Sequence, residues 1–239
     1  MGSINMKLQI AFTLLFLWVT TLFSQEVAID SSKVVDTKYR EDQFYLAITY
    51  NLLANKPQDV SQTGFSSGFH FGYIRDFPLN KRRNFGLGFG LGASINSYNH
   101  NIYVFEDDKG NISYANLNDL DLSYSKNKFA TYLFEVPLEV RWRTSTATEY
   151  KFWRIYTGFK MGYLVGSSTK FKGSGGKVKN NNISYFNNLQ YGLSFSAGYN
   201  TWNFHIYYSL NPILNKDAKL HGESIDMSAI KFGLIFYIL

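Results

Sequence analysis

The sequence predicts an all-β fold: an eight-stranded antiparallel transmembrane β-barrel of the outer-membrane type, preceded by a signal peptide. Its composition favours strands, because 18% of the residues are aromatic and 19 glycines stand against only 4 prolines. Apolar and small or polar residues alternate with a period of two in eight separate segments. The linkers between these segments alternate between short and long, which is the habit of outer-membrane barrels.

Residues 1–24 have the pattern of a secretory signal peptide. Lys7 precedes an almost wholly apolar run at 8–23, and Ser24 supplies a small residue at its end. An N-terminal membrane anchor is the alternative, but the run is short for a span and no basic stop follows it. The chain has no cysteine, which excludes lipoprotein anchoring, disulfides and thiolate metal sites. We expect residues 25–42 to form a flexible periplasmic leader and residues 43–239 to form the barrel.

The eight alternating segments predict the strands in chain order. They lie at 43–51, 65–75, 85–96, 129–143, 152–168, 189–199, 203–210 and 228–239. In each, one face is large and apolar, and the other carries glycine, serine, asparagine or a charge. Segment 85–96 is the clearest, since Phe, Leu, Ala and Ile occupy every odd position and the even positions from 86 to 92 are all glycine.

We predict that the bulky face meets lipid and that the small or charged face lines the lumen. A soluble sandwich with the bulky face inside has the same alternation. However, the small faces are too rich in glycine for a water-facing surface and suit the crowded interior of a narrow barrel. A sheet in lipid must also close, because lipid cannot satisfy free backbone groups. An eight-stranded barrel is filled by its own side chains, so no open pore is expected.

Aromatic residues at the short linkers predict one membrane interface. The short linkers follow the second, fourth and sixth segments, and the short turns of outer-membrane barrels face the periplasm. Because the number of strands is even, both termini are then expected on the periplasmic side as well. The predicted interface aromatics Trp142, Trp153 and Trp202 all lie beside these short turns.

The inward faces carry charges of both signs. We predict a structural ionic network in the lumen, because unpaired buried charges are expensive. Its members are Glu135, Glu139, Arg141, Arg154, Lys160 and Lys231.

No catalytic residue is predicted. His70 and His205 also point inward, and a histidine beside a carboxylate can serve acid–base chemistry. The sequence assembles no nucleophile, base and orienting group, and nothing in it sets His70 near Glu135. A barrel enzyme acting on lipid or peptide is nevertheless kept as an alternative.

Other motifs predict no cofactor, metal or nucleic acid. The glycines of 86–92 repeat every second residue within a strand, unlike a nucleotide-binding loop. The glycine- and lysine-containing stretch 170–177 indicates an external hairpin. Asp107, Asp108, Asp119 and Asp121 lack the fixed spacing of a Ca²⁺ loop and indicate solvated loop. The net charge of +6 is spread too thinly for nucleic-acid binding.

The C-terminal segment resembles the signal that the bacterial barrel-assembly machinery reads. Its pattern has a polar residue, a glycine two positions later and then two apolar residues two positions apart, here Lys231, Gly233, Phe236 and Ile238. The resemblance implies that this machinery is a partner during membrane insertion.

Residues 134–146 and 150–160 resemble the PorT (SprT) proteins of the Bacteroidota, members of the broader outer membrane protein beta-barrel family. The broad resemblance covers most of 44–239. The narrower one implies a non-enzymatic component of type IX protein secretion, and of gliding motility where the organism glides. It implies location in the cell outer membrane and partners among the secretion proteins. A generic small barrel with a structural or adhesive role is the alternative, and the oligomeric state stays open.

Overall fold

The computed structural model describes residues 40–106, 112–120, 122–145, 151–174, 176–181 and 183–238. The predicted signal peptide and most of the predicted leader therefore lie outside the described residues. Within the described ranges, no helix is long and apolar enough to cross a membrane.

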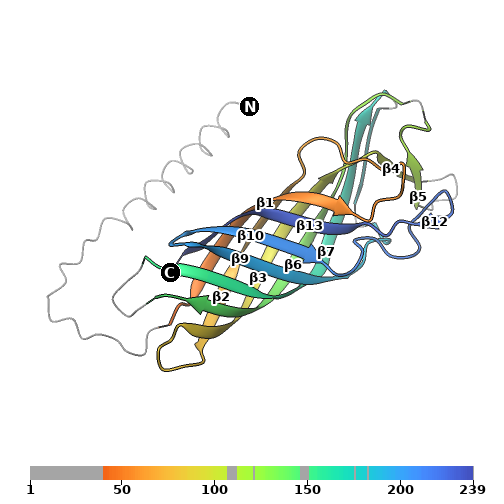
Figure 1. Ribbon diagram of the computed structural model, residues 1–239. Coiled ribbons are helices and arrows are strands. Elements are labelled where there is room, and N and C mark those ends of the chain that lie inside the picture. Colours follow the sequence, from red (N-terminus) through yellow and green to blue (C-terminus); the bar gives the residue numbers. More distant parts are fainter. Residues whose placement is uncertain are drawn as a thin grey trace, which may run out of the picture. The chain divides into compact units, whose positions relative to one another are not determined.

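Eight strands form a closed antiparallel barrel, which confirms the predicted fold class (Figure 1). They are β1 (Gln43–Ala54), β2 (Ser67–Pro78), β3 (Phe85–Asn99), β6 (Tyr124–Arg143), β7 (Trp153–Gly173), β9 (Leu189–Tyr199), β10 (Trp202–Ser209) and β13 (Ser228–Ile238). Each strand pairs with the next in this order. The ring closes where β1 pairs with β13, from Phe44 opposite Ile238 to Ala54 opposite Ser228.

Five further strands lie in the linkers between the barrel strands. They are β4 (Ile102–Glu106), β5 (Ile112–Asn116), β8 (Gly176–Asn181), β11 (Lys219–Leu220) and β12 (Glu223–Ser224). β8 forms the external hairpin that the stretch 170–177 indicates, and no strand was predicted for the other four. β4 pairs with β5, β11 pairs with β12, and β8 adds to the end of β7. All five lie at the end of the barrel that carries the long linkers, here called the long-loop end. The opposite end, with both termini of the barrel, is the short-turn end.

Five barrel strands are longer than their sequence pattern predicts, and β6 and β7 are extended most. β6 begins at Tyr124 rather than at 129, and β7 continues to Gly173 rather than to 168. These extra residues pair with each other, and β8 pairs with β7 beside them. The three-stranded extension projects beyond the barrel rim at the long-loop end (Figure 1).

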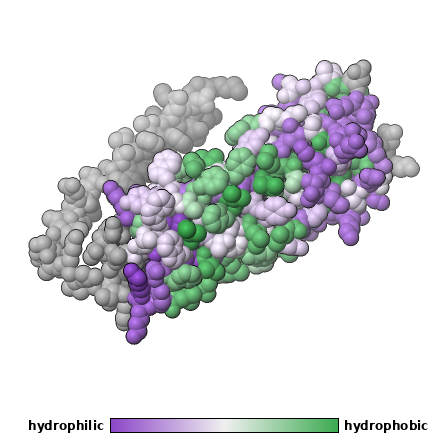
Figure 2. Space-filling view, in the orientation of Figure 1, coloured by the Kyte–Doolittle hydropathy of each residue, from purple (hydrophilic) through white to green (hydrophobic). Residues whose placement is uncertain are grey.

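The sidedness of the strands is as predicted. Phe89, Leu138 and Phe195, from three different strands, expose 47%, 42% and 42% of their surface on the outside of the barrel. The alternate residues are buried within it; β3, for example, switches between exposed and buried along most of its length. Figure 2 shows the resulting hydrophobic band between two hydrophilic ends. Such a band is what a membrane-embedded barrel presents to hydrocarbon.

The glycine rows make room for large residues inside the narrow barrel. The Tyr45 side chain is 2% exposed and lies across the backbones of Gly72 and Gly92. A Cβ atom added at Gly72 would lie 2.6 Å from Cε1 of Tyr45. The tyrosine ring therefore occupies the space that side chains at these two positions would need.

We expect Gly72→Val to destabilise the barrel by about 1–3 kcal/mol or more, because it overpacks the interior against the Tyr45 ring and the β3 backbone at Leu91 and Gly92. Urea titration of the refolded protein in lipid vesicles measures this change. Ala93→Val is the matched control, because Ala93 lies on the outer face beside Gly92. Equal losses of stability in the two variants would show that the interior is not tightly packed at Tyr45.

Candidate functional site

An arginine cluster fills the lumen at the short-turn end. Arg143 donates from both terminal nitrogens to Asp76, at 2.7 Å to Oδ1 and 2.6 Å to Oδ2. Arg141 donates from Nε to Oε2 of Glu139 at 3.1 Å and from Nη1 to Oδ1 of Asp76 at 3.4 Å. Both arginines and Asp76 are completely buried. A two-pronged bond between guanidinium and carboxylate is the strongest geometry for such a pair.

Glu41, just before β1, and Gln43, the first residue of β1, complete the arginine cluster. Arg141 donates from Nη1 to the backbone oxygen of Glu41 at 3.1 Å and from Nη2 to Oε1 of Gln43 at 2.9 Å. The Glu41 carboxylate lies 4.0 Å from Nη2 of Arg154. Three carboxylates, of Glu41, Asp76 and Glu139, therefore face three guanidinium groups, and the charges of the cluster balance.

A second polar centre lies around Glu135 further along the lumen. Ser94 donates to Oε1 of Glu135 at 2.7 Å, and Nδ1 of His70 lies 3.2 Å from the same oxygen. Nζ of Lys160 lies 3.4 Å from Oε2. On the neighbouring strands Glu135 is opposite glycines, Gly92 on β3 and Gly162 on β7. The Tyr45 ring occupies the space that a side chain at Gly92 would need.

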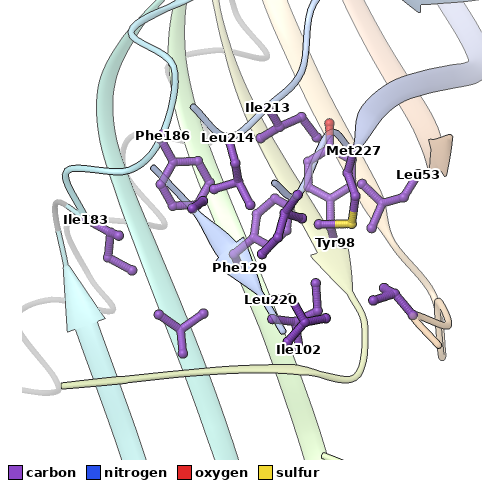
Figure 3. Packing of buried hydrophobic residues seen from close by; sticks show 14 of the residues in the cluster. Leu53, Tyr98, Ile102, Phe129, Ile183, Phe186, Ile213, Leu214, Leu220 and Met227 are labelled. Carbon is purple, nitrogen blue, oxygen red and sulfur yellow. The ribbon is translucent and has the colours of Figure 1, made fainter. Parts of the chain in front are cut away.

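The long-loop end is closed by a hydrophobic core, here called the cap (Figure 3). Its buried members come from strand ends and from four linkers, those after β1, β3, β8 and β10. They are Leu53, Val60, Tyr98, Ile102, Val104, Phe129, Ile183, Phe186, Ile213, Leu214, Ala218, Leu220, Ile225, Met227 and Ala229. The Phe129 ring lies at its centre, 5.0 Å from the ring of Tyr98 and 5.3 Å from that of Phe186.

Buried asparagines tie the cap loops together. Asn101 donates to the backbone oxygen of Asp59 at 2.9 Å and accepts from the backbone N–H of Ser61 at 2.8 Å. Asn116 donates to the same Asp59 oxygen at 2.7 Å. The linker after β1 is thereby fixed to the linker after β3, so these loops form a folded surface.

The comparison with protein families decides what kind of barrel this is. The family described as "Outer membrane protein beta-barrel domain" matches residues 23–215, well over half of the 239 residues. The chain belongs to this family. No curated protein matches the chain. Among solved structures it is similar to Ail, the attachment invasion locus protein of Yersinia pestis, at 12% identity and a TM-score of 0.29, over 82% of this chain and 97% of that one.

As an outer membrane protein beta-barrel, the chain is located in the outer membrane. The short turns of such barrels face the periplasm and the long loops face the exterior. The arginine cluster therefore lies at the periplasmic end of this outer-membrane barrel, and the cap lies outside the cell.

All six predicted lumen charges are buried inside the barrel. Glu135 and Lys160 meet in the second polar centre, and Glu139, Arg141 and Arg154 belong to the arginine cluster. Lys231 forms no salt bridge with a described residue and lies with Nζ 4.9 Å from the centre of the Tyr207 ring.

Three members of the arginine cluster were not among the predicted network residues: Asp76, Arg143 and Glu41. The predicted second strand ends at residue 75, which leaves Asp76 in the following linker; this prediction is wrong, because β2 continues to Pro78. Asp76 shares the inward parity of His70 and Ile74, so extending the alternation by one step would have found it. Glu41 lies before the first strand, where no periodicity indicates its burial.

The three predicted interface aromatics lie at the periplasmic end of the barrel. Trp153 and Trp202 are 58% and 64% exposed. The Trp202 ring packs edge-on against Phe236 at 4.8 Å. In the predicted assembly signal, Lys231 is buried and Ile238 is 46% exposed, on opposite faces of β13. The interface and assembly roles of these residues stay predictions.

The structure forms one chain of contacts with the geometry of a catalytic triad. His70 lies between Glu135, 3.2 Å from its Nδ1, and Thr49, whose Oγ1 is 3.3 Å from its Nε2. A carboxylate that orients a histidine beside a hydroxyl is the arrangement used in acyl transfer. However, Thr49 is 1% exposed, His70 2% and Glu135 1%. No substrate reaches a hydroxyl buried to this degree, so these contacts fit a structural role.

The acidic residues of the longest loop form no metal site in the described part of the chain. Asp107, Asp108 and Asp121 lie outside the described residues. Asp119 pairs with His221 at 3.0 Å on the exposed surface. No group of three potential metal ligands occurs among the residues that the structure describes.

His100 makes the cap sensitive to acid. It is 1% exposed, its Nδ1 accepts the backbone N–H of Ile102 at 3.0 Å, and its ring lies 4.8 Å from that of Phe129. Burial lowers the pKa of His100 to about 3. This pKa is below the value of about 6.5 in an unfolded chain, so the stability from neutral His100 is present above pH 6.5 and is lost towards pH 3.

We expect the stability of the cap to fall by about 1.4 kcal/mol for each pH unit below 6.5 until pH 3 is approached. Hydrogen exchange of the cap amides at pH 7 and pH 4.5, corrected for intrinsic rates, measures this change. His100→Asn keeps an acceptor but cannot be protonated, so it should remove the pH dependence. A His100→Asn variant with the same dependence would assign it to another group.

Proposed function

We propose that this outer-membrane barrel is a closed, non-enzymatic scaffold that presents its folded cap outside the cell, in a structural or adhesive role. The observation that carries this proposal is that the protein's own side chains occupy both the lumen and its outer end. The lumen contains the arginine cluster and the centre around Glu135, with no member of either more than 8% exposed. A scaffold of this kind acts through its surface, and the cap loops are the part accessible to partners outside the cell.

Conductance in planar bilayers tests whether the lumen is closed. The full protein is expected to form no large stable channel. A variant that lacks residues 211–226, and with them part of the cap, is expected to remain non-conducting because the charged lumen is still filled. Large stable channels in the unaltered protein would contradict the proposal. Channels in the shortened variant alone would assign the closure to the cap.

Complementation of a gene deletion tests the role of the cap. Cells that carry a barrel with its cap loops replaced by short glycine–serine turns are expected to keep the barrel in the outer membrane. The gene deletion is expected to impair either attachment to surfaces or the integrity of the envelope. Cells with the replaced cap loops are expected to show the same defect as the deletion. Full complementation by the replaced version would overturn a role for the cap.

We propose a role in type IX secretion as a second candidate. Its support is the resemblance of residues 134–146 and 150–160 to the PorT (SprT) proteins. These two segments carry most of the inward charges of β6 and β7. The family match covers barrels in general and does not distinguish this role. Deleting the gene and comparing the secreted proteome tests it, and unchanged secretion counts against it. Loss of secretion together with normal attachment would favour it over the adhesive role.

We also propose that residues 1–24 are removed on export. The support is the charged start, apolar run and small residue described above. Mass spectrometry of the protein purified from outer membranes is expected to give a mature N-terminus at Gln25. A chain that keeps residues 8–23 would instead support the N-terminal anchor.

A further inference from the structure

The three-stranded extension outside the cell carries lysines in two rows across its strands. The strand register places Lys170 of β7 directly between Lys128 of β6 and Lys179 of β8, and Lys172 between Lys126 and Lys177. These six residues are here called the lysine ladder. Directly paired residues on neighbouring strands share a face, and their Cβ atoms lie about 5 Å apart. Within each strand the two lysines are two residues apart, so all six side chains share one face of the sheet.

This face is the outer one. The alternate residues of the same strands, Asn127 and Phe171, are buried at 5% and 3% exposure. The Phe171 ring packs 4.7 Å from that of Tyr103 in the β4–β5 hairpin. Five of the six lysines are exposed, and Lys128 is half-buried with Nζ 3.1 Å from Oγ of Ser97. The lysine ladder therefore forms a dense patch of positive charge on the external surface.

Folding does not account for this arrangement. Like charges directly opposite each other on neighbouring strands destabilise a sheet. In the part of the chain that the structure describes, no salt bridge joins a ladder lysine to a carboxylate. A bound anion would remove the repulsion, and it would interact with several lysines at once.

The height of the lysine ladder above the membrane indicates which anion it meets. Towards the membrane from the lysine ladder, β6 and β7 carry exposed residues on the lipid-facing surface. Tyr132 of β6 is 38% exposed, and Tyr163 and Val165 of β7 are 57% and 66% exposed. Tyr132 is four residues from Lys128 along β6, a distance of about 13 Å along the strand. Exposed aromatic residues mark the membrane interface in barrels of this kind. The lysine ladder therefore stands at the level of the head groups of the outer leaflet.

We propose that the lysine ladder binds the phosphate groups of an anionic glycolipid in the outer leaflet, the lipopolysaccharide that surrounds the barrel. Phosphates offer strong acceptors to ammonium groups, and each lysine binds them as a compact point charge. A two-dimensional array of ammonium groups contacts more than one phosphate of a head group at the same time. This site is independent of the cap and of its proposed function.

The test uses the full-length protein in detergent, titrated with fluorescent lipopolysaccharide at low and at high salt. Lys170→Gln, Lys172→Gln and Lys179→Gln together remove half of the lysine ladder. Each lysine near an anionic lipid surface contributes a factor of about five, so this variant is expected to bind about 100-fold more weakly. The matched control carries Lys56→Gln, Lys216→Gln and Lys219→Gln. These are exposed lysines of other external loops, and the control is expected to bind lipopolysaccharide as the unaltered protein does.

Four results would overturn the proposal. They are undiminished binding by the ladder variant, an equal loss in the control variant, equal binding of dephosphorylated lipopolysaccharide, and preference for a soluble polyanion such as heparin over lipopolysaccharide. The ladder variant is also expected to unfold at a higher urea concentration, because it relieves repulsion. If it fails to fold, the comparison of phosphorylated and dephosphorylated lipopolysaccharide on the unaltered protein decides.

Discussion

Replacing Asp76 with alanine is expected to lower the free energy of unfolding of the barrel by about 3–5 kcal/mol, the usual cost of breaking a buried ion pair from one side. Asp76 accepts from both terminal nitrogens of Arg143 and from Arg141. Without it, the two fully buried guanidinium groups keep Glu41 and Glu139 as the carboxylates of the described cluster and otherwise bond to the neutral oxygens of Gln43 and Arg83. Few other single substitutions in the lumen remove so many charged contacts.

Urea titration in lipid vesicles, followed by the shift between folded and unfolded bands on an unboiled gel, measures this loss. Asp119→Ala is the matched control, because it removes an aspartate from the exposed pair with His221 and should cost less than about 1 kcal/mol. Adding Arg143→Met to Asp76→Ala should restore part of the stability by removing one unpaired charge. Similar effects of the Asp76 and Asp119 variants would mean that the arginine cluster is solvated.

Replacing Phe129 with alanine is expected to open the cap while the barrel stays folded. Phe129 is 2% exposed and packs against Tyr98, His100 and Phe186. Removing a buried phenylalanine costs about 3–5 kcal/mol. Because the cap is formed by the external ends of the strands and the linkers beyond them, this cost should act mainly on the packing of the loops.

Limited proteolysis of intact cells or vesicles detects the change, since cap loops that are packed in the unaltered protein should be cut rapidly in the variant. Phe65→Ala provides the control, because Phe65 is 70% exposed and lies outside the buried cluster. The folded band on unboiled gels should persist in both variants. Loss of that band in the Phe129 variant would show that cap and barrel unfold as one unit.

The barrel strands and their sidedness were predictable because the period-two pattern is a local property. Segment 189–199 was predicted with the bounds that β9 has, and the inward parity of Glu135 and Lys231 followed from the same alternation. Strand ends were less predictable. Before residue 129 in β6 and after residue 168 in β7, lysine alternates with asparagine or phenylalanine. A membrane strand is expected to have large apolar residues on its outer face, so lysines at the outward positions indicated a loop instead.

The cap and the pairing of lumen charges were not predictable from one sequence. Cap residues such as Ile213, Ile225 and Met227 stand among polar neighbours with no periodicity, and only the folded loops bring them together. Partners across the lumen depend on the stagger of the whole barrel. His70 and Glu135, for example, lie on β2 and β6, which are separated by β3, so no local pattern indicates that they meet.

The pairing of β1 with β13 has a consequence for how the protein is made. The two strands that seal the ring come from opposite ends of the barrel sequence: Ala54 pairs with Ser228, and the bond between Asn55 and Ser228 joins residues 173 positions apart. Until β13 has been synthesised, β1 keeps an unpaired edge, which lipid does not tolerate and which aggregates readily in water. The chain must therefore cross the periplasm unfolded and protected, so chaperone supply should limit its yield.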